Sequence, residues 1–229
     1  MSGHPIEPWE LAPARKAAIL AELEVAVRDR MASVRNPVHD FKHVQRVRRQ
    51  ARRAAWELGL DPDLADLAAL LHDLGRAVEH EHPGVNHADL SLAMSVELLA
   101  RYEAELPQPL LDAVLHAIEK HSRVGCDACL LAALKEADAL DTLGAIGIAR
   151  AAMTWAGGPD YDPERLRQAP AEWDPPRIHS MTDQLRFQMG LLREIQTEGG
   201  LRIARRRLAL MQAYWDQLWD EIEGKDGNP

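Results

Sequence analysis

Apolar residues recur at helical spacing along almost the whole chain, and prolines, glycines or capping residues separate the runs. The runs cover about residues 11–33, 40–59, 62–74, 87–102, 109–122, 126–156, 180–198 and 201–223, and residues 76–86 are predicted to be a polar loop. The predicted caps include Asp40, Asp61 and Ser180, the pair Gly199-Gly200 is predicted to end the run over 180–198, and Gly144 and Gly147 are predicted to mark close packing rather than a helix end. No stretch alternates apolar and polar residues for long enough to predict a strand. Ala, Leu, Glu and Arg are abundant, whereas the β-branched and aromatic residues that favour strands are scarce. We therefore predict an all-α fold.

The length of 229 residues suits one domain with appendages. We predict that residues 1–30 form an N-terminal helical extension and that residues 31–223 form the main domain with its C-terminal helices. The segment 157–178 contains five of the 14 prolines and lies between two predicted helices. Because long irregular loops in compact domains are often functional, we interpret this segment as a candidate lid.

Charge and hydropathy disfavour several classes of protein. The chain has 27 basic and 36 acidic residues, and the net charge of −9 disfavours general nucleic-acid binding. No apolar run approaches the roughly 18 residues that predict a membrane span, and the first ten residues do not resemble a secretory signal. We expect a cytoplasmic protein. The pair Trp215 and Trp219 is compatible with internal packing or with a homodimer contact.

Cys126 and Cys129 form a CxxC pair. The second cysteine pair of a zinc ribbon is missing, as is the βαβ context of a thioredoxin-like site. We interpret the two cysteines as small residues in a turn at the start of a helix, and their role stays open.

Four residues from three predicted helices are candidates for a metal site: His43, His72, Asp73 and Asp138. His72 and Asp73 are adjacent in the apolar run over 62–74, and an ionised carboxylate buried there needs a partner. A divalent cation would supply that partner. Imidazole nitrogens with carboxylate oxygens suit Mn, Fe, Co, Ni or Zn, and suit Mg less well. On spacing alone, structural roles for these residues are an equally good interpretation.

The chain resembles a known family over about residues 31–223. The order His43, His72-Asp73, Asp138 is similar to the H…HD…D signature of the HD-domain metal-dependent phosphohydrolases. Residues 39–47 resemble the HDxxHxxRV opening of the small stand-alone bacterial members, the YedJ-like type, and residues 69–75 resemble AxLHDxG. Residues 117–122 and 137–150 resemble AIxxHS and ADxLDxxGAIGIAR.

This resemblance implies metal-assisted hydrolysis of the phosphate ester of a small metabolite, plausibly a nucleotide, by an HD domain over residues 31–223. It makes His43, His72, Asp73 and Asp138 the ligands of one or two divalent ions, with Asp73 as the catalytic residue that bridges two metals or accepts a proton. Asp141 would hold a ligand in place through a hydrogen bond.

Further residues follow from the same resemblance. His87 and His121 correspond to histidines that two-metal relatives place beside the site, where they bind a second ion or the phosphate. Arg76, Lys120 and Arg46 are the expected phosphate contacts.

Three positions depart from the family pattern. Glu136 stands where relatives usually carry Asp, Ala139 where they carry Arg, and Gln184 where they often carry Lys. The four expected ligands are unaffected, but the lost basic groups indicate altered or abolished anion binding.

Two other functions stay open. A di-iron HD-type oxygenase would need His87 and His121 as iron ligands, and oxygen uptake would distinguish it from a hydrolase. A non-catalytic nucleotide-binding or regulatory HD protein would be stabilised by nucleotide without forming product.

Overall fold

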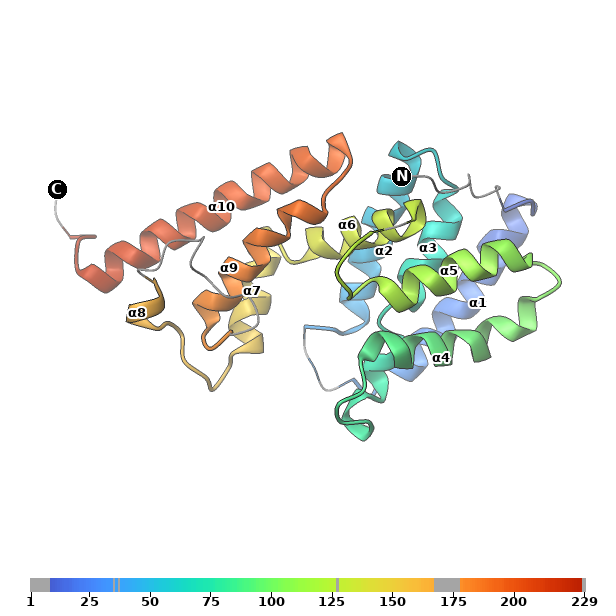
Figure 1. The fold of residues 1–229 in the computed structure, drawn as a ribbon, viewed down its shortest axis with the longest axis horizontal. Helices are drawn as coiled ribbons and strands as arrows, with labels where there is room; N and C mark the ends of the chain where they lie inside the picture. The colour runs from blue at the N-terminus through green and yellow to red at the C-terminus, as the bar shows by residue number, and fades with distance from the viewer. Residues whose placement is uncertain (1–8, 35, 37, 127, 167–177, 228–229) are drawn as a thin grey trace. The chain divides into compact units, whose positions relative to one another are not determined.

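In a computed structural model, the described residues (9–34, 36, 38–126, 128–166 and 178–227) form helices and connecting turns with no strand, which confirms the all-α prediction (Figure 1). The α-helices in this part of the chain are α1 (Pro13–Met31), α2 (Phe41–Glu57), α3 (Pro62–Leu71), α4 (His87–Leu99), α5 (Gln108–Lys120), α6 (Cys129–Asp141), α7 (Gly144–Thr154), α8 (Pro163–Leu166), α9 (Met181–Gly190) and α10 (Glu198–Glu223). Short 3-10 helices are η1 (Leu74–Ala77), η2 (Glu79–Glu81), η3 (Ala100–Tyr102) and η5 (Leu191–Glu194).

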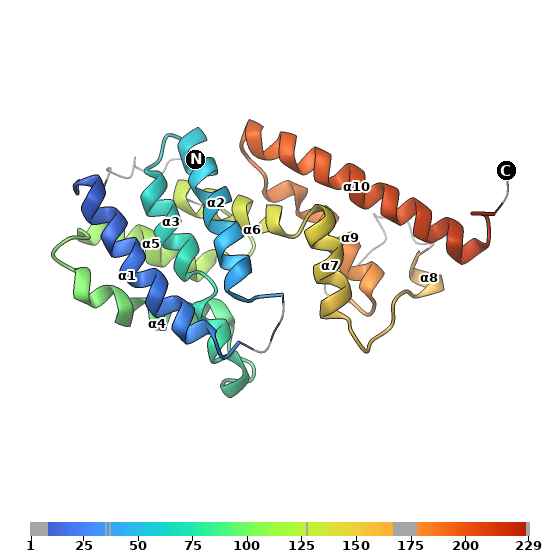
Figure 2. The ribbon, with the colours of Figure 1, turned by 180° about the vertical axis from the view of Figure 1, so that it is seen from behind.

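The chain divides into two compact units, residues 1–138 and residues 139–229. Helices α1 to α5 and most of α6 share the core of the first unit, with Leu23, Leu70 and Ile118 at its centre. Both views show α1 alongside α3 (Figures 1 and 2). In the second unit, α10 packs on α7 and α9 around Leu185 and Met211. The boundary after residue 30 stays a prediction, although the core contacts group α1 with the helices that follow it.

Capping side chains set the start of the helices that carry the candidate site. The Asp40 carboxylate accepts hydrogen bonds from two backbone N–H groups of the first turn, one of them that of His43, and so begins α2. Asp61 caps α3 in the same way, and Asn86 caps α4 directly before His87. The local sequence thus fixes where two of the candidate histidines enter their helices.

The single helix predicted over 126–156 is wrong, because the segment forms two helices. α6 ends at Asp141 and α7 begins at Gly144, whose φ of +79° lies in the left-handed region that glycine adopts at little cost. A Cβ atom on Gly147 would lie 1.9 Å from the carbonyl oxygen of Thr142. These glycines do mark close packing, as predicted, but the packing occurs across a turn between two helices.

The helix predicted over 180–198 is shorter than expected. α9 starts after the predicted cap, Ser180, but ends at Gly190. Gly199 and Gly200, predicted to end that helix, lie instead in the first turn of α10. The Thr197 hydroxyl accepts a hydrogen bond from the Gly200 N–H, so a capped helix begins where the glycine pair predicted an end.

The candidate lid is only partly described. Residues 163–166 form α8, and Arg165 pairs with Asp183 of α9 at 2.9 Å, whereas residues 167–177 lie outside the described residues. Closure of this segment over a site stays a prediction. No helix among the described residues is both long and apolar enough to cross a membrane.

Candidate metal centre

The four predicted ligands come from three places in the first unit. His43 lies in the first turn of α2, at the point that the Asp40 cap fixes. His72 and Asp73 follow directly on the last residue of α3, and Asp138 lies on α6. Asp73 has φ −108° and ψ 15°, outside the helical region, so the separation of about 100° between neighbours on a helix does not apply to this pair.

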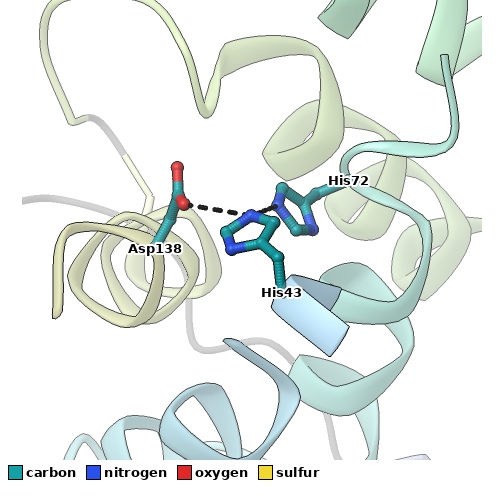
Figure 3. Close-up of side chains that lie close together, drawn as sticks. All are labelled: His43, His72 and Asp138. Carbon is teal, nitrogen blue, oxygen red and sulfur yellow. Dashed lines mark hydrogen bonds and ion pairs between the residues drawn. The ribbon is translucent and has the colours of Figure 1, made fainter. Parts of the chain in front are cut away.

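His43, His72 and Asp138 lie close together, with their polar atoms facing one another (Figure 3). The Nε2 atom of His43 is 3.3 Å from Nε2 of His72 and 3.5 Å from Oδ1 of Asp138. Asp73 Oδ2 lies 3.5 Å from His43 Nε2 and 3.8 Å from His72 Nε2. His43 Nε2 therefore has one imidazole nitrogen and two carboxylate oxygens within 3.5 Å. We call His43, His72 and Asp138 the first group.

The other oxygen of Asp73 faces a different set of side chains. Oδ1 lies 3.4 Å from His87 Nε2, 3.8 Å from His121 Nε2 and 3.4 Å from Arg76 Nε. The two imidazoles are also neighbours, with 3.2 Å between their Nε2 atoms. We call Arg76, His87 and His121 the second group. Asp73 stands between the two groups and presents one oxygen to each.

Backbone carbonyl groups orient two of the imidazole rings. His72 Nδ1 lies 2.8 Å from the carbonyl oxygen of Ala69, and His121 Nδ1 lies 2.7 Å from that of Ile118. Because a carbonyl oxygen only accepts, Nδ1 carries the hydrogen in each neutral ring. Nε2 then has a free lone pair directed toward Asp73, which is the arrangement of a metal-binding histidine.

Among the residues that the structure describes, two sets of three side chains have ligand atoms within 4.8 Å of one another and could hold a metal ion. One set is the first group, and the other is His72, Asp73 and His121. All of these residues are buried except Asp138, whose side chain is 33% exposed. Asp138 therefore has the most contact with solvent among the ligand candidates.

Burial and neighbouring groups set the protonation of the site. Burial lowers the pKa of His72 to about 4, against the opposing attraction of Asp73, and it lowers the pKa of His87 to about 4 as well. Burial raises the pKa of Asp73, but His72, the other neighbouring imidazoles and the Arg76 guanidinium outweigh it, so this pKa lies well below the usual range. The pKa of Asp138 is also lowered, because His43 and His72 outweigh burial. Neutral imidazoles and ionised carboxylates at neutral pH are the forms that bind metals.

Gly75 allows α4 to approach Asp73. A Cβ atom at Gly75 would lie 2.3 Å from the carbonyl oxygen of His87 and 2.6 Å from the backbone nitrogen of Ser91. The Gly75 N–H also donates a 2.8 Å hydrogen bond to the buried Ser91 hydroxyl. The glycine that follows the His-Asp pair thus fixes the first turn of α4, and with it His87, against η1.

The remaining predicted contact residues are not part of either group. Lys120 pairs with Glu119 at 2.8 Å, and its side chain is 35% exposed. Arg46 is half-buried on α2, one turn beyond His43. The Asp141 carboxylate accepts a 2.5 Å hydrogen bond from Arg150 in the second unit. The expected roles of Lys120, Arg46 and Asp141 stay predictions.

The departures from the family pattern have different surroundings. Glu136 is fully buried and forms a 2.6 Å ion pair with Arg53, which connects α6 to α2 inside the first unit. Ala139 is buried and Gln184 is half-buried on α9. The cysteines Cys126 and Cys129 are free and half-buried.

Two side chains beside the site had no predicted role. The His39 ring packs edge-on against His43 with 5.6 Å between ring centroids, and its position in the HDxxHxxRV segment was a signal for it. Glu79 accepts hydrogen bonds of 2.9 and 3.0 Å from Arg76. Residues 76–86 were predicted as a loop, whereas η1 and η2 give this pair the helical spacing that lets it form.

The chain is similar to known proteins over part of its sequence. Residues 40–143 match the model of the HD domain. Ribonuclease Y of Alkaliphilus metalliredigens is 39% identical over 81 residues, and the match covers 35% of this chain but only 15% of that protein. The chain thus spans a small part of the length of this curated relative.

Two solved structures are similar over most of the chain. A protein of Lactobacillus plantarum is 26% identical, with a TM-score of 0.69, over 90% of this chain and 98% of its own. YpgQ of Bacillus subtilis, in complex with ADP, is 22% identical, with a TM-score of 0.65, over 93% of this chain and 99% of its own. At this identity the second likeness shows a shared fold alone.

Proposed function

This chain is an HD-domain protein, and we propose that it is a metal-dependent phosphohydrolase that acts on the phosphate ester of a small metabolite, such as a nucleotide. The observation that carries the proposal is the grouping of His72, Asp73 and Asp138 around His43, whose Nε2 lies 3.3 to 3.5 Å from an atom of each. Without a cation, an ionised carboxylate buried at Asp73, with the carboxylate of Asp138 beside the same imidazole of His43, would be unfavourable.

The donor set fits a divalent transition metal. Two imidazoles and two carboxylates form a mixed nitrogen and oxygen set, which suits Mn, Fe, Co, Ni or Zn better than Mg. His72 is held in the binding tautomer by the Ala69 carbonyl group. We propose that His43, His72, Asp73 and Asp138 hold the ion.

The side chains around the ion would have two further roles, which are accepting a proton and orienting the phosphate. When bound, a divalent metal lowers the pKa of water toward neutrality and offsets the negative charge on phosphoryl oxygens. Asp73 is ionised and can accept the proton that the attacking water gives up. The second group faces the opposite oxygen of Asp73, and its Arg76 guanidinium would orient the phosphate through N–H donors.

Arg76 favours a single ion over two. Its guanidinium lies 3.4 Å from Asp73 Oδ1 and 3.3 Å from His87 Nε2, where a second cation would have to bind. Like charges at such distances repel strongly in a buried site. A guanidinium is, by contrast, well suited to a phosphate group. We therefore assign the second group to the substrate.

Two observations favour a small substrate. The net charge of −9 disfavours a long polyanion as the substrate of the metal centre, and the similar YpgQ structure holds ADP. The relative named ribonuclease Y makes RNA the polymeric alternative to test. A cytoplasmic location and a homodimer stay predictions.

The proposal is tested by metal analysis of the purified protein and by assays of nucleotides, other phosphate monoesters and single-stranded RNA with Mn, Co, Ni, Zn and Mg. We expect about one bound ion and phosphate release from a small ester, and Asp73→Asn should abolish both. The exposed acid Asp112 on α5 provides a matched control, and Asp112→Asn should change neither. Full activity in Asp73→Asn would refute the site, and cleavage of RNA alone would refute the small substrate.

A di-iron oxygenase is the second candidate, because His87 and His121 both lie within 4 Å of Asp73. Two bound irons and oxygen uptake without phosphate release would favour it. Binding of nucleotide without any product would instead favour a regulatory HD protein.

A further inference from the structure

Every exposed residue of α2 is basic or aromatic. These residues are Lys42, Arg49, Arg52 and Trp56. Their spacings of seven, three and four residues place them on one face of the helix, and we call them the α2 ridge. At about 100° per residue, each of them points at least a quarter-turn away from His43. The α2 ridge is therefore separate from the metal centre.

Much of the positive charge of the α2 ridge is not neutralised. The side chains of Lys42 and Arg49 form no ion pair with any residue that the structure describes. Arg52 pairs with Asp63 at 2.6 Å and with Asp66 at 3.3 Å, and it uses one terminal nitrogen for both. The rest of its guanidinium is left for another acceptor. Exposed cations in such a row form a track for a polyanion.

A cavity of about 240 Å³ opens beside the ridge, lined by Gln45, Arg48, Arg49, Arg52 and Asp66. Asp66 is 5% exposed and accepts hydrogen bonds from both Arg48 and Arg52. It therefore fixes these guanidinium groups in the cavity wall. Together with Glu24, 2.6 Å from Arg48, and Asp63, 2.6 Å from Arg52, it also neutralises much of their charge, so the charge offered to a ligand comes mainly from Arg49. Arg49 and the amide of Gln45 complete a hollow with donors for a phosphate group.

Trp56 ends the α2 ridge with an accessible ring. Its side chain is 75% exposed, whereas most other described tryptophans are buried or half-buried. It follows Arg49 by seven residues, or about 10 Å along the helix axis. An aromatic ring next to exposed cations is the arrangement on which single-stranded nucleic acids stack a base while their phosphates contact the basic side chains.

We propose that the α2 ridge binds single-stranded nucleic acid. Lys42, Arg49 and Arg52 contact the phosphodiester backbone, and an unpaired base stacks on Trp56. An acidic protein segment would use the cations but would leave the ring unused, and a duplex would hide its base faces. Because the net charge of the chain is −9, we expect phosphates to bind only next to the cations of the ridge. Added salt should screen these contacts and weaken the binding.

The test is titration of the full chain, with EDTA present, by fluorescein-labelled oligo(U) and oligo(dT) in anisotropy and tryptophan-quenching assays. We expect saturable binding and quenching, with log affinity falling against log salt at a slope of about −2 for three contacts to a single strand. Trp56→Ala should weaken binding roughly tenfold or more, whereas Trp56→Phe should retain most of it. Lys42→Ala/Arg49→Ala should weaken binding and reduce the slope to about −0.7. Preference between the two oligonucleotides tells whether RNA or DNA is the ligand.

Arg205→Ala/Arg206→Ala on α10 removes the same charge from another exposed surface and should leave binding unchanged. Absence of binding to either oligonucleotide overturns the proposal. An equal loss in the α10 control, stronger binding of a duplex, or equal binding of polyglutamate would also overturn it. Hydrolysis of a small phosphate ester should persist in every ridge variant, so this test is independent of the proposed function.

Discussion

The two oxygens of Asp73 face surroundings of opposite character. The first group adds a second carboxylate, Asp138, to two imidazoles, whereas the second group adds a guanidinium, Arg76. Both contain histidines at similar distances from Asp73. The charged member therefore distinguishes them: the first group is suited to a cation and the second to an anion. Histidine positions alone would not separate a metal site from a phosphate site in this protein.

The largest expected effect comes from removing a histidine of the first group. His43→Ala should lose the bound metal and lower kcat/KM by at least about hundredfold, because Nε2 of His43 lies nearest to both His72 and Asp138. Metal analysis and steady-state kinetics measure the two losses. His80→Ala, on the 49% exposed His80 of η2, is the control and should change neither value. Unchanged metal content in His43→Ala would show that the first group does not hold the metal, and the proposed difference between the first and second groups would be wrong.

Arg76→Met should separate the second group from the first. The metal should stay bound, because Arg76 is not a ligand, whereas turnover should fall by about hundredfold as the phosphate loses its charged donor. Loss of the repelling charge beside His87 should also allow a second ion to bind at high metal concentration. Lys120→Met changes a more exposed cation and should cost less than about tenfold. Loss of the first metal in Arg76→Met would contradict the assignment.

Stability of the metal-free protein should fall on acidification. His72 has a pKa of about 4 in the folded protein and about 6.5 when unfolded, so the unfolded chain binds the proton first as the pH falls below 6.5. The lowered pKa of Asp73 acts in the same direction at lower pH. We expect His72 alone to remove about 3 kcal/mol of unfolding free energy between pH 6.5 and pH 4.

Urea unfolding in EDTA at several pH values measures this loss, and His72→Asn should flatten the profile. Stability that stays constant from pH 6.5 to pH 4 would show that His72 is not held neutral by burial.

Gly75→Ala should have a smaller and more local effect. The added methyl group would overlap the backbone of His87 and Ser91, so α4 has to move, at a cost of about 1–3 kcal/mol. Because His87 moves with α4, KM should rise while the metal stays bound. Gly84→Ala is a control in open space at a positive φ, and it should reduce stability without changing KM. A loss of metal in Gly75→Ala, with KM unchanged, would indicate that the second group holds the metal and that the first group does not.

The sequence was sufficient to predict the helical fold and most of the helix starts, because Asp40, Asp61 and Ser180 act locally on the turns that follow them. It was not sufficient for the break between α6 and α7, which depends on how Gly147 packs against the Thr142 carbonyl group. The same holds for Gly199 and Gly200, whose position after Thr197 outweighs their usual helix-ending role.

The site shows the same limit. The family resemblance named the residues that lie around Asp73, but not which of its oxygens each one faces. That arrangement arises from contacts distant in sequence, such as Gly75 with Ser91 and Glu136 with Arg53. Arg76 was expected to contact phosphate, yet its position between Asp73, Glu79 and His87, from which the single-ion proposal follows, required the folded geometry.

Anomalous diffraction at the manganese edge, from crystals grown with Mn²⁺ and a non-hydrolysable nucleotide, would locate the ion and the phosphate group in one experiment. We expect one manganese peak bound by His43, His72, Asp73 and Asp138, with a phosphate group against Arg76, His87 and His121. A second peak of equal height between His87 and His121, or a single peak away from His43, would contradict this expectation.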